Sequence, residues 1–285
     1  MDARLVWRTW RRILTNDSLV EWVLHAKQSN ATVTMGLTPE EVAIVADYAN
    51  TPLATETNIG MYRRGLVRNA LAALSHVPLT NRQLYASGLD VEAVAEDYVR
   101  STGFRDDGPN FWKIAGGFVA HILRLPEFVS PLTQDILALD AATTALARTL
   151  GESAPRLWPE SAASLFSSGA FASSRLTRGS TRFVVNRAAV AVTSSCDLTA
   201  LLESPEDFDP NEKFAPSIRH WLVYFPAADA PIAYAELSEP TARVFNALST
   251  PKTESEVSTI LAGLPIGELI DSLGEVGVVV TEGDT

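Results

Sequence analysis

The chain has 285 residues, of which 46% are apolar, so it is long enough for about two packed domains and too apolar for wholesale disorder. The formal net charge is -11, and residues 218–285 hold only three Lys and Arg against ten Asp and Glu. Nucleic-acid binding requires cations that neutralise phosphates, so this charge argues against a nucleic-acid partner. Cys196 is the only cysteine, which excludes an intramolecular disulfide and a zinc site built from several cysteines.

The sequence has no pattern typical of membrane insertion or secretion. No uninterrupted apolar run reaches the roughly 18 residues that cross a bilayer. The N-terminal segment is basic but lacks an apolar stretch followed by a small-residue cleavage site. We therefore expect a soluble, cytoplasmic protein without membrane contacts.

Residues 1–150 have the apolar spacing of a helical domain. Thr38 and Glu41 have the spacing of a capping box at a helix start. The first helix places arginines at helical spacing beside Trp7, and we assign partner docking to Arg4, Trp7, Arg8 and Arg11. The alternatives are ordinary core packing for the tryptophan and a solvated face for the arginines.

Residues 151–180 are rich in Ser, Ala and Pro, which is typical of a linker. Residues 181–285 then alternate strand-like and helix-like patterns, with a hairpin expected in HWLVYFPAADAPIAYAEL. Ser238 is expected to cap one helix, and Thr253 with Glu256 a second. Gly277 suits the left-handed end of a third helix. The predicted fold class is α+β, a helical domain followed by a winged-helix-like domain.

This C-terminal order resembles the peptide-recognition elements of pathways that modify ribosomally made peptides, such as the peptide chaperone of pyrroloquinoline quinone biosynthesis. The similarity lies in the hairpin and the segments LSEPTARVFNAL, TESEVSTIL and IGELIDSLGEVGVVV. It implies that a peptide adds as a strand along residues 232–237, beside the third helix. The peptide-binding residues implied are Ile232, Tyr234, Ala235, Glu236, Leu269, Ser272, Leu273 and Val276. For Leu269 and Leu273, a place in the core is an equally good interpretation.

The helical half is similar to the helical domain that accompanies multinuclear non-haem iron oxidases with TIM-barrel folds. The residues that carry this resemblance are Tyr62-Arg63, the turn from His76 to Thr80, Ala95, Tyr98, Phe111 and Trp112. Together the two resemblances imply the accessory subunit of such an oxidase, as in methanobactin biosynthesis or the 3-thiaglutamate pathway. The chain would bind a precursor or carrier peptide in a heterodimer and present its C-terminal residue, a cysteine, to iron in the partner.

The sequence itself contains no catalytic or metal-binding motif. None of His25, His76, His121 and His220 has HxxxH or HExxH spacing, and no P-loop, GxSxG or GxGxxG occurs. We therefore expect no cofactor, no metal and no catalytic residue in this chain, which acts only as a required subunit. Two alternatives are a winged-helix transcriptional regulator with a helical sensor domain and a stand-alone enzyme of another type.

Overall fold

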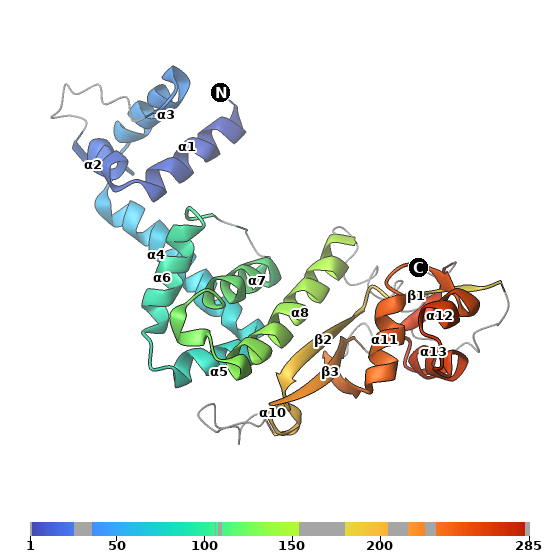
Figure 1. Ribbon diagram of the computed structural model, residues 1–285. Coiled ribbons are helices and arrows are strands. Elements are labelled where there is room, and N and C mark those ends of the chain that lie inside the picture. The colour runs from blue at the N-terminus through green and yellow to red at the C-terminus, as the bar shows by residue number, and fades with distance from the viewer. Residues whose placement is uncertain are drawn as a thin grey trace. The chain divides into compact units, whose positions relative to one another are not determined.

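The computed structural model describes residues 2–25, 36–105, 107, 110–153, 180–204, 216–225 and 232–282. Its helices lie mainly in the first half of the chain and its strands in the second half (Figure 1). The strands form two small antiparallel sheets of three strands each. The predicted α+β class, with helices before strands, is therefore confirmed. Within the described residues, every helix is too short or too polar to span a lipid bilayer.

The chain divides into two compact units. The N-terminal unit comprises residues 1–76 and 88–118, and the C-terminal unit comprises residues 77–87 and 119–285. The helices α5 (Pro78–Ala86) and α8 (Pro131–Ser153), which the sequence placed in a helical domain of residues 1–150, group instead with the strands. Most of the expected linker, residues 154–179, lies outside the described residues.

The N-terminal unit is all helical where it is described. Its elements are α1 (Ala3–Thr15), α2 (Asp17–His25), α3 (Pro39–Ala49), α4 (Glu56–Ala73), the 3-10 turn η1 (Leu74–His76), α6 (Val91–Ser101) and most of α7 (Phe111–Ile122). The expected capping box of Thr38 and Glu41 starts α3. Gly117 of α7 lies so close to Tyr98 of α6 that an added Cβ would meet the tyrosine hydroxyl at 2.6 Å. Gly117 thus allows these helices to pack closely.

The larger structural element of the C-terminal unit is a sheet with the order β2-β3-β4. It consists of β2 (Ala189–Cys196), β3 (Pro216–Tyr224) and β4 (Ala233–Leu237), with a register shift between Ser194 and Cys196. The predicted hairpin of β3 and β4 is confirmed, with His220 opposite Leu237 and Tyr224 opposite Ala233. Because β4 is the last strand in this order, only one of its sides is paired within the described residues.

Helices cover both faces of this sheet, as Figure 1 shows with α8 on one side of β2 and β3 and α11 on the other. On one face, Trp221 and Val223 pack with residues of α5 and α8 in one buried cluster. On the other face, Leu222 and Leu237 pack with the C-terminal helices in a second buried cluster. These helices are α11 (Glu239–Ala247), α12 (Glu254–Ile260) and α13 (Ile266–Glu275).

The second sheet joins segments that are far apart in the chain. Its order is β5-β1-β6, with β1 (Arg182–Val185) between β5 (Lys252–Thr253) and β6 (Val279–Thr281). Asn186 fastens the end of β1, since its side-chain amide donates to the Gly277 carbonyl and its backbone N–H to that of Val278, both at 2.9 Å. Gly277 has φ 74°, the predicted left-handed conformation. The remaining short elements of this unit are η2 (Pro126–Phe128) and α10 (Thr199–Glu203).

Candidate functional site

The outer side of β4 is the candidate binding surface, and the hydrogen bonds of the sheet identify its free backbone groups. The backbone N–H of Phe225, at the end of β3, donates to the Ala188 carbonyl beside β2 at 3.0 Å. Backbone groups in an antiparallel strand point alternately to its two sides, so those of Tyr224, Leu222 and His220 point to β4. Their partners are Ala233, Ala235 and Leu237.

The backbone groups of the alternate residues of β4 therefore point away from the sheet. These residues are Tyr234 and Glu236, with Ile232 just before the strand. Within the described residues, none of the three has a backbone hydrogen-bond partner on the outer side of the strand. A row of unpaired N–H and C=O groups of this kind is a template for another strand.

The side chains of β4 are anchored in both layers of the unit. Ala235 and Leu237 pack against the cluster of α11 and α13, whereas Ile232 and Tyr234 pack against the cluster of α8. The Tyr234 hydroxyl lies 3.2 Å from the Thr143 hydroxyl of α8, and burial raises the pKa of Tyr234. The predicted contact residue Tyr234 thus holds the strand in place with its side chain and leaves only its backbone to a guest.

Glu236 is exposed on β4, but its carboxylate already has a partner. Arg219 on β3 donates to Glu236 at 2.9 Å and to Asp197 at 3.0 Å. The cross-strand pair of Arg219 and Glu236 fixes the strand register on the α8 side of the sheet. The carboxylate of Glu236 is therefore occupied, whereas its backbone N–H is available.

The other edge strand, β2, is less open than β4. The Asp135 carboxylate of α8 accepts hydrogen bonds from the backbone N–H groups of Ser195 and Cys196, at 2.7 and 3.0 Å. One end of β2 is therefore already bonded to a helix, which limits strand addition there. Among the described edges of this sheet, β4 is the better candidate.

The helix α13 contributes a partly exposed flank. Leu269 is half-buried against the cluster of α11 and α13, Ser272 is exposed and Val276 is 46% exposed. Leu273 is only 2% exposed and belongs to the core, so of the two interpretations that the sequence left open, the core interpretation holds for Leu273. Three of the four residues assigned to this helix thus have surface that a ligand can touch.

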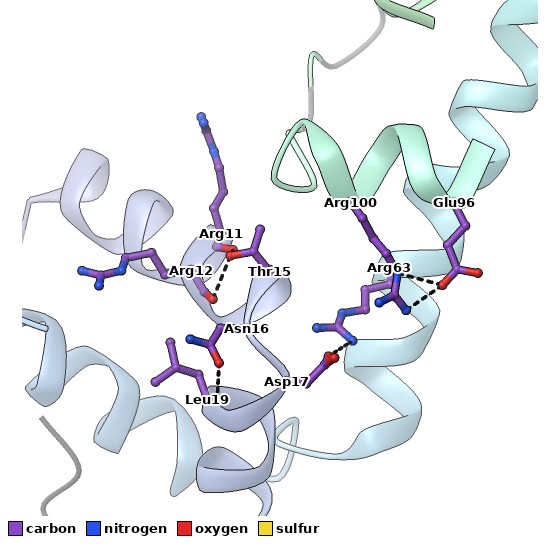
Figure 2. A network of polar contacts seen from close by, with 9 residues as sticks. All are labelled: Arg11, Arg12, Thr15, Asn16, Asp17, Leu19, Arg63, Glu96 and Arg100. Carbon is purple, nitrogen blue, oxygen red and sulfur yellow. Dashed lines mark hydrogen bonds and ion pairs between the residues drawn. The ribbon is translucent and has the colours of Figure 1, made fainter. Parts of the chain in front are cut away.

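One arginine of the predicted docking set on α1, Arg8, has an ion pair within the N-terminal unit. Arg8 and Arg12 pair with Glu41 at 3.3 and 2.8 Å, and Glu41 is 2% exposed. The backbone N–H of Thr38 and the Arg12 guanidinium lower the pKa of Glu41. Figure 2 shows the side chains of Arg11 and Arg12 extending in different directions. Arg4, Trp7 and Arg8 are exposed, so they remain the accessible members of the assigned set, whereas Arg11 is half-buried.

Figure 2 also shows an ion pair between α2 and α4 and another within α6. Asp17 at the start of α2 pairs with Arg63 of α4 at 2.9 Å, and the Arg63 guanidinium lies 5.1 Å from the centre of the Phe104 ring. Arg100 pairs with Glu96 at 2.8 Å along α6. These arginines are engaged inside the unit and are structural.

Sequence reasoning missed a buried carboxyl group in the C-terminal unit. Asp140 of α8 is fully buried and accepts the backbone N–H of Thr80 at 2.6 Å. Thr80 lies in the first turn of α5, and the residue before that helix, Val77, provides no side-chain cap. Burial raises the pKa of Asp140 to about 7. The one signal in the sequence was the start of α5, where no neighbouring side chain can accept the hydrogen bonds of the first backbone N–H groups and a distant acceptor is therefore needed.

Two other features do not form a site. An open groove of about 540 Å³ lies beside β5 and α12, but its charged side chains already have partners. Arg182 donates to the Pro251 carbonyl at 2.7 Å, and Lys252 donates to the Ala247 carbonyl at 2.7 Å. Among the described residues, no group of three or more His, Cys, Asp or Glu is placed to hold a metal ion.

Comparison of the sequence with protein-family models and with curated proteins finds no match.

Proposed function

We propose that this chain is a recognition subunit that binds an extended peptide segment as an added strand on β4. The observation that carries the proposal is the outward-facing backbone of Tyr234 and Glu236, at a sheet edge that no other described strand pairs with. In strand addition, backbone hydrogen bonds supply affinity and alternate side-chain contacts supply specificity. The partly exposed residues Leu269, Ser272 and Val276 of α13 supply the side-chain contacts.

The same proposal includes a winged-helix-like fold for the C-terminal part of the chain. The segment from β4 to β6 consists of a strand, three helices with two of the expected caps, the two-residue strand β5 between the first two helices, and a closing strand. This order supports a winged-helix-like peptide-recognition element. A DNA-reading role for α13 is not supported, because it carries Glu268, Asp271 and Glu275 and no Lys or Arg.

The N-terminal unit then docks a TIM-barrel multinuclear iron oxidase, and Arg4, Trp7 and Arg8 are the accessible residues for that contact. The bound peptide would present its C-terminal residue, a cysteine, to iron in the partner. Holding the substrate there makes an encounter between two molecules effectively unimolecular. Under this proposal the chain contributes positioning, and the partner contributes the chemistry.

One pair of substitutions at a single residue tests strand addition. Glu236→Pro removes an outward-facing N–H, where an edge strand tolerates proline. Glu236→Ala keeps the N–H and loses the same Arg219 pair. Against a peptide encoded beside this gene, fluorescence anisotropy should show at least about a tenfold loss of affinity for the proline variant and little loss for the alanine variant.

The competing edge provides the control. By the same alternation, the backbone N–H of Thr193 on β2 points away from β3. Thr193→Pro removes this N–H and should leave peptide affinity unchanged if the peptide binds β4. Equal affinities for Glu236→Pro and Glu236→Ala, with a loss for Thr193→Pro, would move the site to β2 and refute the proposal for β4.

A further inference from the structure

The helix α1 is positively charged, although the chain as a whole is acidic. It contains four arginines and no Asp, Glu or Lys, whereas the whole chain has a formal net charge of -11. Its buried residues Thr9 and Ile13 lie on the face that packs into the N-terminal unit. The opposite face carries residues spaced three or four positions apart, which are Arg4, Trp7, Arg8 and Arg11. This docking face of α1 therefore combines positive charge with one large aromatic side chain.

Carboxylates of the N-terminal unit neutralise the docking face only in part. Arg8 shares the Glu41 carboxylate with Arg12, so two guanidinium groups pair with one carboxylate. The Arg8 side chain is still 64% exposed. Within the described residues, neither Arg4 nor Arg11 has an ion pair. Figure 2 shows the Arg11 guanidinium directed away from the other side chains drawn, so the docking face keeps an excess of positive charge.

An exposed tryptophan lies among these arginines. Trp7 is 40% exposed, and it is the only exposed tryptophan among those that the structure describes. Arg4 lies about one turn before Trp7, and Arg11 lies about one turn after it. Tryptophan and arginine are among the residue types that dominate binding energy at protein interfaces, where lysine is depleted. The composition of the docking face is therefore that of a protein interface.

Membranes and nucleic acids fit the docking face less well than an acidic protein surface does. A membrane-binding helix inserts a continuous apolar face, whereas Trp7 is the one large apolar side chain that α1 exposes. A nucleic acid is a long polyanion, and beyond α1 it would meet a chain with 34 Asp and Glu against 23 Lys and Arg. Arg4 and Arg11 are about 10 Å apart along the helix axis, or about one Debye length at physiological salt. Their charges therefore act together on a compact acidic patch.

We infer that the docking face of α1 binds an apolar pocket with a rim of Asp and Glu on the partner oxidase. Trp7 fills the pocket, and the arginines on either side of it meet the carboxylates of the rim. Arginine suits this contact because its planar guanidinium can donate two parallel hydrogen bonds to one carboxylate. This inference rests on the proposed docking of an oxidase and names the chemistry of the partner surface.

Surface plasmon resonance of the full chain with the oxidase encoded beside its gene tests the inference. The association rate should fall at least about tenfold between about 50 mM and about 300 mM salt, because salt screens the attraction. Trp7→Ala should weaken binding at least about tenfold at both salt concentrations. The control Leu53→Ala removes another exposed apolar side chain of the same unit, which is 61% exposed, and should leave binding unchanged.

Charge removal on α1 gives the matched comparison. The double variant Arg4→Gln with Arg8→Gln removes two exposed charges one turn apart, while Glu41 keeps its second arginine. It should bind the oxidase roughly fivefold more weakly at the lower salt concentration, as expected for two partly exposed ion pairs, and depend less on salt. The control is Arg64→Gln with Arg68→Gln, which removes two charges with the same spacing from exposed positions on α4. It should bind as the native protein does.

The results separate this inference from the proposed function. If the oxidase binds but neither salt, Trp7→Ala nor Arg4→Gln with Arg8→Gln changes its binding, docking stands and the acidic pocket is wrong. An equal loss in the α4 control also overturns the inference, because the attraction is then not specific to α1. Binding to vesicles of anionic lipid that the α1 charge variant loses would assign this face to a membrane instead. Failure of the native chain to bind the oxidase overturns the proposed docking together with this inference.

Discussion

At the scale of single residues, Asp140 gives the clearest link between geometry and stability. Its carboxyl group is completely enclosed, yet its Oδ2 atom caps the first turn of α5. Burial penalises the charged form, so the pKa rises from an ordinary 3.8 to about 7. Between these two values, the folded protein keeps a proton that the unfolded chain has lost. The free energy of unfolding should therefore decrease as the pH rises through this window.

The variant Asp140→Asn tests this dependence. The amide keeps an acceptor oxygen for the Thr80 N–H and carries no charge at either pH. Chemical denaturation gives the free energy of unfolding of both proteins at about pH 4.5 and about pH 8. The value for the variant minus that for the native protein should be roughly 3 kcal/mol larger at the higher pH. Asp47→Asn, at an exposed position, should give the same difference from the native protein at both pH values. An Asp140→Asn difference that does not change with pH would contradict the assignment.

At the scale of elements, the contact between α6 and α7 depends on a missing side chain. A Cβ at Gly117 would lie 2.6 Å from the Tyr98 hydroxyl. A Cβ added at Gly65 in α4 would meet no neighbouring atom within 4 Å. Tyr98 stacks on Phe118 at 5.0 Å, so it has little freedom to move aside. Gly117→Ala should therefore lower the free energy of unfolding by about 2 kcal/mol, the cost of overpacking.

Gly65→Ala is the matched control, because alanine is the better helix former and meets no neighbour. It should raise the free energy of unfolding by about 0.5–1 kcal/mol. Denaturant titration of both variants measures the two effects. A stability gain for Gly117→Ala would show that the helices do not need this close approach.

Local patterns predicted the elements well, because caps and turns depend on neighbouring residues. The capping boxes of Thr38 and Thr253, the turn at Gly277 and the hairpin of β3 and β4 were all expected and are all present. The pairing of β1 with β5 and β6 was not predicted, because it joins residues about 70 or more positions apart. Local periodicity carries no information about such contacts.

The candidate site was predictable in part for the same reason. Alternation along residues 232–237 identified a strand, but only the sheet order shows that β4 is an edge. Periodicity placed Leu269 and Leu273 on one stripe without saying how deep each lies, and the packing places Leu273 in the core. The arginine stripe of α1 was visible in the sequence, whereas the pairing of Arg8 and Arg12 with the buried Glu41 required the tertiary structure.

At the scale of the whole molecule, the proposed function assigns peptide binding to the C-terminal unit and partner docking to the N-terminal unit. The C-terminal unit carries the open strand edge, fixed on one face by α8 and on the other by α11 and α13. The N-terminal unit keeps most of its arginines in internal ion pairs and exposes Trp7. A rigid edge lowers the entropy cost of binding an extended peptide, because only the peptide must become ordered.

The central claim is that a peptide pairs with the outer backbone of β4. Residue-resolved amide hydrogen exchange with the peptide encoded beside this gene tests it directly. Its addition should slow exchange at the Tyr234 and Glu236 N–H groups, which have no backbone partner among the residues that the structure describes. Peptide binding that leaves both amides unchanged and instead protects Ala191 and Thr193 on β2 would contradict the account.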